Sequence, residues 1–162
     1  MRHLRTTEHP LHFKTIEWPM KGKKVVIMVR GDVFSFGLEV YFREWGFDPV
    51  LVARPDATRV PFFLREHQPA LLVTDLLTWH GGPVSGELHA APPPIPVLLL
   101  VAHNQMSPAQ YAALQGVPNY QVLPKPCPVA HLKRVVEGLL SVAIPADVPV
   151  EMVAPAWPAG RL

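Results

Sequence analysis

The sequence predicts an α/β fold in which helices cover both faces of a doubly wound, five-stranded parallel sheet. Five short apolar runs recur along the chain, and segments with helical spacing of apolar residues lie between them. Two of the runs are apolar without interruption, as strands buried on both faces are. The chain has 162 residues, of which 49% are hydrophobic and 17% charged, so it can form one domain with a full core.

The first strand is predicted at residues 25–29, a run rich in Val that follows three lysines. Over residues 33–45, apolar side chains recur at helical spacing, namely Phe34, Leu38, Tyr41, Phe42 and Trp45. Gly46 stands where a helix C-cap would. This segment is therefore predicted to be the first helix.

The second strand is predicted at residues 49–53. Asp56 or Thr58 caps the helix that follows, and Gln68-Pro69 ends it, because a residue before proline disfavours the helical conformation. Residues 70–74 predict the third strand, which leads to Asp75.

The segment between Asp75 and the fourth strand, predicted at residues 97–102, is rich in helix breakers. Gly81-Gly82-Pro83 and three consecutive prolines at 92–94 leave room for only a weak helical patch at residues 86–91. The third helix is therefore expected to be short or absent.

Ser107-Pro108 provides an N-cap and a proline at the first helical position, which predicts a helix to about Leu114. The fifth strand is predicted at residues 120–123. The last helix begins near Pro128, and one of its faces carries Val129, Leu132, Val135, Val136, Leu139 and Leu140.

In such a sheet, ligands bind outside the carboxyl ends of the strands. No glycine-rich dinucleotide motif, Walker loop, CxxC pair or nucleophile elbow follows any predicted strand. These observations argue against dinucleotide-binding, P-loop and hydrolase functions.

Two motifs at the strand ends resemble the receiver domains of bacterial response regulators, which are flavodoxin-like. The run from Leu71 to Asp75 (LLVTD) resembles the strand that carries their phosphoacceptor aspartate, and Leu123-Pro124-Lys125-Pro126 resembles their Lys-Pro motif. The similarity covers about residues 21–142. It implies a role in two-component signal transduction, with Asp75 at the phosphoacceptor position.

The resemblance also implies an acidic pair after the first strand, which helps to hold magnesium in the family. Counting back from Gly46 places Val29 and Arg30 there. A shorter loop would instead match Gly31 and Asp32, which leaves one carboxylate at best. One carboxylate beside Asp75 is a poor cage for magnesium, which prefers several oxygen ligands in octahedral geometry.

The hydroxyl residue that the family has at the end of the fourth strand is replaced by Val101 and Ala102. Phosphoryl transfer needs magnesium and a lysine to neutralise the developing charge. The chain is therefore expected to be a degenerate pseudo-receiver without a cofactor, and Mg²⁺ belongs only to the alternative in which Asp75 is phosphorylated.

The predicted pocket places Arg30, Asp32, Ala102 and Lys125 around Asp75. Arg30 is expected to form a bidentate pair with Asp75 while Lys125 approaches from another strand end. Permanent neutralisation of this kind would lock one signalling state. The alternative is that Arg30 points to solvent and pairs with nothing.

Trp79, His80, Tyr111 and Tyr120 are the partner-binding candidates. Trp79 and His80 follow Asp75 in a glycine-containing loop, where an aromatic side chain either contacts a partner or folds back over the sheet. His80 and His103 lie near Asp75, but their separation matches no metal-binding motif.

Outside the domain at residues 21–143, an extension at 1–20 and a proline-rich tail at 144–162 are expected. Phe13, Ile16 and Trp18 of the extension could dock on the domain or on another copy of it. The tail has too many prolines for a helix and is either a partner-binding strand or disordered.

The formal charge is +2 and the pI about 8.9, with basic residues scattered, so nucleic acid is not an expected partner. Cys127 is the single cysteine and cannot form an internal disulfide, which suits the cytoplasm. No signal peptide and no apolar stretch that could span a bilayer is recognised.

The leading hypothesis is therefore a non-enzymatic signalling domain that acts through protein–protein interaction, independently of phosphorylation. Its binding face is expected around the fourth strand, the last helix and residues 111–115. The partner would be a histidine kinase, a receiver-containing protein or a second copy. The alternatives are a response regulator phosphorylated on Asp75 by a histidine kinase, and a flavodoxin-like domain that binds a small molecule or metal between Arg30, Asp75, His80, His103 and Lys125.

Overall fold

The apolar runs of the sequence form one parallel sheet with the strand order β2-β1-β3-β4-β5. The computed structural model describes residues 21–76, 78, 93–102 and 104–141. The strands are β1 (Lys24–Met28), β2 (Asp48–Leu51), β3 (Leu71–Asp75), β4 (Val97–Ala102) and β5 (Tyr120–Lys125). The predicted five-stranded parallel sheet is confirmed.

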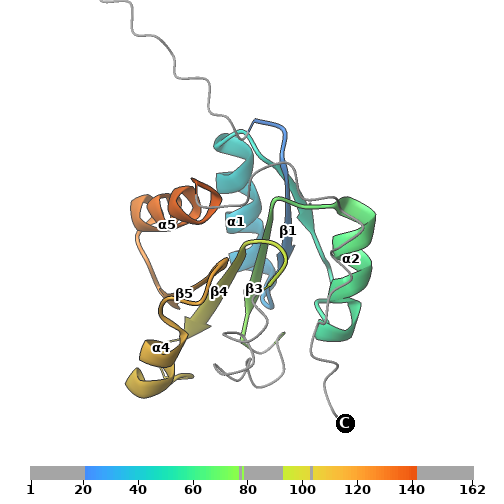
Figure 1. Cartoon of the computed structure of the whole chain (residues 1–162). Helices are drawn as coiled ribbons and strands as arrows, with labels where there is room; N and C mark the ends of the chain where they lie inside the picture. The colour runs from blue at the N-terminus through green and yellow to red at the C-terminus, as the bar shows by residue number, and fades with distance from the viewer. Residues whose placement is uncertain (1–20, 77, 79–92, 103, 142–162) are drawn as a thin grey trace, which may run out of the picture.

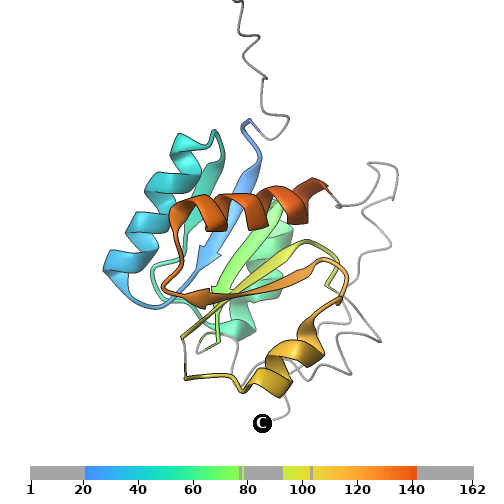
Figure 2. The same cartoon turned by 90° about the vertical axis from the view of Figure 1, so that its left-hand side faces the viewer.

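Helices cover both faces of this sheet, as Figures 1 and 2 show. They are α1 (Asp32–Glu44), α2 (Val60–His67), which follows the 3₁₀ helix η1 (Ala57–Arg59), α4 (Pro108–Leu114) and α5 (Val129–Ser141). The buried side chains of α1 and α5 belong to one core cluster, and those of α2 and α4 belong to the other. The fold is therefore doubly wound.

The two core clusters arise because successive side chains of a strand point to opposite faces. In β1, Val25 and Ile27 face the α1 and α5 layer, whereas Val26 and Met28 face the α2 and α4 layer. All four are fully buried. This explains why the central strands lack the polar alternation of strands with one wet face.

Helix α1 is anchored by an aromatic cluster at its carboxyl end. The Phe42 ring packs edge-on against Trp45 and Phe47, with centroid distances of 5.3 and 5.6 Å. Gly46 follows with φ of 87°, a conformation that favours glycine, and it turns the chain into β2.

Two of the predicted helix caps are resolved in detail. The backbone amide of Thr58 donates to Asp56 Oδ1 over 2.9 Å, so Asp56 caps the short 3₁₀ helix η1. Helix α2 itself has Arg59 at its N-cap and no side-chain cap, which differs from the prediction. At α4, Ser107 and Gln110 form a capping box in which each side chain accepts a hydrogen bond from the other residue's backbone amide. The predicted start of this helix is confirmed.

Some predictions fall elsewhere. Strand β2 begins and ends one to two residues before the predicted 49–53. The predicted weak helix at 86–91, the extension at 1–20 and the tail at 144–162 lie outside the described residues. Within the described part of the chain, no helix has the length and apolar character needed to cross a membrane.

The two edge strands have a common feature. Strand β2 pairs with β1 alone and β5 with β4 alone among the described strands. Each edge strand contains one proline, Pro49 in β2 and Pro124 in β5.

Candidate functional site

Asp75 lies at the carboxyl end of β3 and is only 3% exposed. Its Oδ2 accepts a hydrogen bond from the backbone amide of Arg30 over 2.7 Å. Its Oδ1 accepts another from the backbone amide of Thr78, also over 2.7 Å. Both carboxylate oxygens are therefore engaged, and the side chain ties the loop after β1 to the turn after β3.

The register of the sheet explains this placement. Met28 of β1 pairs with Thr74 of β3, so the chain just after β1 runs alongside Asp75. The Thr74 hydroxyl donates to the carbonyl oxygen of Met28 over 3.2 Å and adds a second link between these strands. Val29 is buried in the core, which leaves the amide of Arg30 to face the carboxylate.

The side chain of Arg30 does not follow the sequence-based expectation. Arg30 is exposed, and within the described residues its guanidinium forms no ion pair with Asp75. The predicted bidentate pair is therefore wrong, and the alternative of a solvent-exposed arginine is correct. The hydrogen bonds that Asp75 does accept come from the backbone amides of Arg30 and Thr78.

Lys125 ends β5 at the same edge of the sheet, opposite Ala102 of β4. Its Nζ lies 5.0 Å from the centroid of the Phe34 ring, in the first turn of α1. This is a cation–π contact. Arg30 therefore does not neutralise Asp75, contrary to the expectation. The ammonium group of Lys125 contacts the aromatic ring of Phe34 on α1.

Gln105, which the sequence did not single out as a candidate, forms hydrogen bonds with the last residue of β4. The Gln105 side chain accepts a hydrogen bond from the Ala102 amide over 2.9 Å, and the Gln105 amide donates to the Ala102 carbonyl over 3.0 Å. Val101 is buried in the core. No hydroxyl group is present at this position, as the sequence indicated.

Asp32 is the remaining acidic candidate and is the first residue of α1, where it is exposed. The described residues contain no cluster of three His, Cys, Asp or Glu side chains that could hold a metal. Both oxygens of Asp75 also accept backbone hydrogen bonds. The described residues do not fit a magnesium site of the kind that the receiver resemblance implies. His80 and His103 lie outside them.

The two tyrosines predicted to contact a partner, Tyr111 and Tyr120, differ in how far they are exposed to solvent. Tyr111 is half-buried, and its hydroxyl donates to the carbonyl oxygen of Val122 over 3.2 Å, which fastens α4 to β5. Tyr120 is 3% exposed, and its hydroxyl finds no hydrogen-bond partner among the described residues. The prediction that Tyr120 contacts a partner is therefore wrong, because the side chain faces the core between the sheet and α4. Trp79 and His80 lie outside the described residues.

Burial also raises the pKa of two side chains, Tyr120 and Cys127. Removal from water raises the pKa of the Tyr120 hydroxyl far above its usual value, because the phenolate would be desolvated. Partial burial likewise raises the pKa of the Cys127 thiol. Cys127 is packed against the core beside α5.

Comparison with solved structures reveals the same fold in receiver domains. A putative response regulator from Chloroflexus aurantiacus is 20% identical, covers 75% of this chain and 99% of its own, and superposes with a TM-score of 0.58. A response regulator receiver protein from Sinorhizobium medicae is 20% identical, with coverages of 74% and 95% and a TM-score of 0.56.

A third similar structure is the signal receiver domain of a signal transduction histidine kinase from Syntrophus aciditrophicus. It is 23% identical, covers 74% of this chain and 91% of its own, and has a TM-score of 0.57. No family model and no curated protein matches the sequence. The chain therefore has a receiver-like, flavodoxin-like fold.

Proposed function

We propose that this chain is a non-catalytic signalling domain that acts by binding a protein partner and does not depend on phosphorylation of Asp75. The observation that carries the proposal is the state of the Asp75 carboxylate. Both of its oxygens accept short backbone hydrogen bonds inside the protein, at 2.7 Å each. Asp75 then serves as a fixed link between two loops.

Phosphoryl transfer would need different surroundings. Cations beside the carboxylate must neutralise the charge that develops on the transferred group. Here each oxygen faces an N–H donor, and the Nζ of Lys125 lies over Phe34. Ala102 offers no hydroxyl that could follow a phosphoryl group. These features favour a permanently set conformation.

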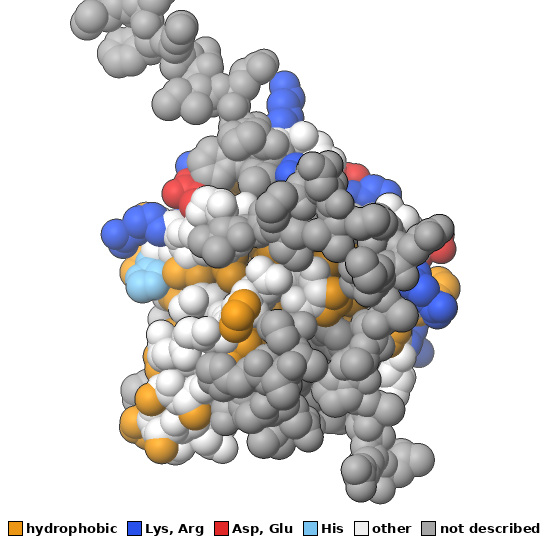
Figure 3. Space-filling view, in the orientation of Figure 1, with side chains coloured by type: hydrophobic (Ala, Val, Ile, Leu, Met, Phe, Trp, Pro, Cys, Tyr) orange, Lys and Arg blue, Asp and Glu red, His pale blue; other side chains and the backbone are white. Residues whose placement is uncertain are grey.

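The surface over α4 and β5 is the binding face that we propose. Helix α4 contains no charged residue, and Figure 3 shows mostly apolar and neutral side chains at the lower left, where this helix lies. Ala109 and Ala112 are exposed there, and Tyr111 holds the helix on β5. A small, uncharged helix face suits close contact with another protein, because few polar groups need to be desolvated.

The first experiment is intact-protein mass spectrometry after incubation with acetyl phosphate and Mg²⁺, with Asp75→Asn as the matched variant. A receiver domain of known activity, treated in parallel, shows that the donor works. We expect no phosphoryl mass on the wild type. A single phosphoryl adduct that Asp75→Asn lacks would instead establish the alternative, a phosphoacceptor switch.

A second experiment tests whether the partner is another copy of the chain. Sedimentation velocity of the wild type and of Ala112→Glu compares assembly with and without a charge on the α4 face. Ala130→Glu, an exposed position at the start of α5, is the matched control. A dimer that only Ala112→Glu dissociates would identify the second copy as the partner. A wild type that is monomeric throughout would exclude it and direct the search to other signalling proteins.

A further inference from the structure

Helix α1 is apolar on two sides. Its inner side buries Ser35, Leu38 and Phe42 against the sheet. Its outer side carries a second apolar stripe of Val33, Phe36 and Val40, which are 89%, 56% and 54% exposed. Spacings of three and four residues place these side chains along one face of the helix. Contiguous apolar side chains on a solvent face can mark a contact site.

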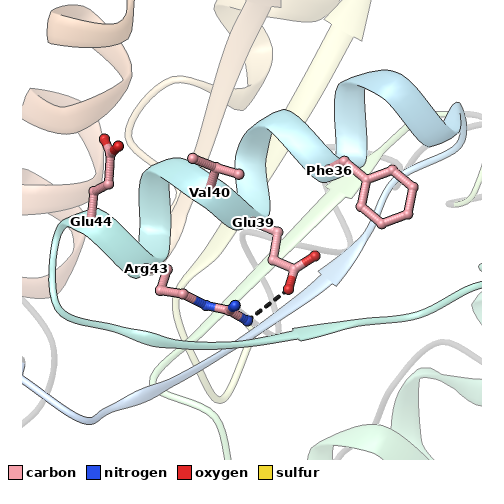
Figure 4. A pocket seen from close by; sticks show the side chains of 5 residues that line it. All are labelled: Phe36, Glu39, Val40, Arg43 and Glu44. Atoms are coloured by element: carbon pink, nitrogen blue, oxygen red, sulfur yellow. Dashed lines mark hydrogen bonds and ion pairs between the residues drawn. The ribbon is translucent and has the colours of Figure 1, made fainter.

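The stripe borders a shallow hollow on the outer surface. Its lining comes from α1 alone among the described residues: Phe36, Glu39, Val40, Arg43 and Glu44. In Figure 4, Val40 and Glu44 point to one side of the helix as drawn, and Glu39 and Arg43, which form an ion pair of 2.7 Å, point to the other. The elements on which α1 packs are β1 and β2.

We infer that residues 1–20 of the same chain cover this outer face of α1. The chain enters the described domain beside the carboxyl end of α1, where the amide of Gly22 donates to the carbonyl of Gly46 over 2.8 Å. Residues 1–20 are therefore joined to the domain at one end of the stripe. The inference stands independently of the function proposed above.

The length and the residue pattern of the segment match the helix. Helix α1 has 13 residues and is about 20 Å long, which an extended run of about six or seven residues spans. In an extended run, Ile16, Trp18 and Met20 fall on one side, since alternate side chains share a side. Lys14, next on that side, would then come within reach of the exposed Asp32 at the far end of α1.

The size of the stripe favours an attached segment over a second copy. A stable complex between two copies buries at least about 1,000 Å². Three partly exposed apolar side chains offer less and support binding only of about millimolar strength. A segment joined to the domain by a short linker acts at an effective concentration of about a millimolar, so the same weak contact becomes populated.

Paramagnetic relaxation in the full chain tests the inference. A spin label is attached to Thr15→Cys in a Cys127→Ala background, and the backbone amides of Val33 and Phe36 are compared with those of α4. We expect signal loss at the α1 amides that exceeds the loss at α4. Phe36→Ser with Val40→Ser should abolish this difference, whereas Phe62→Ser, an exposed phenylalanine on α2, should preserve it.

Two results would overturn the inference. The first is equal signal loss at α1 and α4 in the labelled protein. The second is signal loss at α1 in a mixture of spin-labelled, isotope-free chains with unlabelled, ¹⁵N-enriched chains, since only contact between copies produces it. The replaced positions on α1 are exposed, so thermal unfolding of each variant should match that of its background.

Discussion

Replacing Asp75 tests whether this carboxylate holds the fold together. Asp75→Ala leaves the part-buried amide of Arg30 and the buried amide of Thr78 without acceptors, and each such loss costs about 1–3 kcal/mol. Removing a buried carboxylate also relieves its desolvation penalty, which offsets part of the loss. We expect the free energy of unfolding to fall by about 3 kcal/mol. Asp75→Asn keeps one acceptor and should lose about half as much.

The assay is urea unfolding followed by circular dichroism, with the m-value checked for constancy across the variants. Asp48→Asn, an exposed aspartate at the start of β2, is the matched control and should stay within about 0.5 kcal/mol of the wild type. If both Asp75 variants also stay within about 0.5 kcal/mol, the structural role assigned to this carboxylate is wrong.

Three further predictions each concern one or two side chains. Because the buried Tyr120 keeps its proton to a higher pH than in the unfolded chain, the free energy of unfolding should fall above about pH 10 by about 1.4 kcal/mol per pH unit. Urea unfolding of Tyr120→Phe should lack this component, and an unchanged alkaline slope would contradict the assignment. A double-mutant cycle of Lys125→Met and Phe34→Leu should give a coupling of about 0.5–1 kcal/mol, whereas additive effects would exclude the cation–π contact. Ser107→Ala should lower thermal stability by about 1 kcal/mol through loss of the capping box, and an unaltered melting temperature would count against it.

The fold was accessible from the sequence because its strongest signals are local. The apolar run at 97–102 became β4 with the same bounds. The helical spacing at 33–45 became α1, which starts one residue earlier at Asp32 because Gly31 adopts a φ of 98° that ends the preceding loop. The bounds of β2 were less predictable because an edge strand pairs on one side only, so fewer contacts fix its ends.

The site was less accessible because its contacts depend on the direction of backbone groups. Sequence identified Asp75 and placed Arg30 beside it, but the contact comes from the Arg30 amide and the side chain turns outward. The residue types alone do not show which way a backbone amide or its side chain points. Tyr120, by contrast, carried a usable signal: it shares the face of β5 with Val122, two residues on, and both belong to the same buried cluster.

The prolines of β2 and β5 bear on how the domain avoids uncontrolled self-association. A free edge strand exposes unpaired amides on which another chain can add a strand and start aggregation. Pro49 and Pro124 each remove one amide from an edge strand, so neither border offers a continuous row of donors. Growth of the sheet from chain to chain is thereby discouraged at both ends.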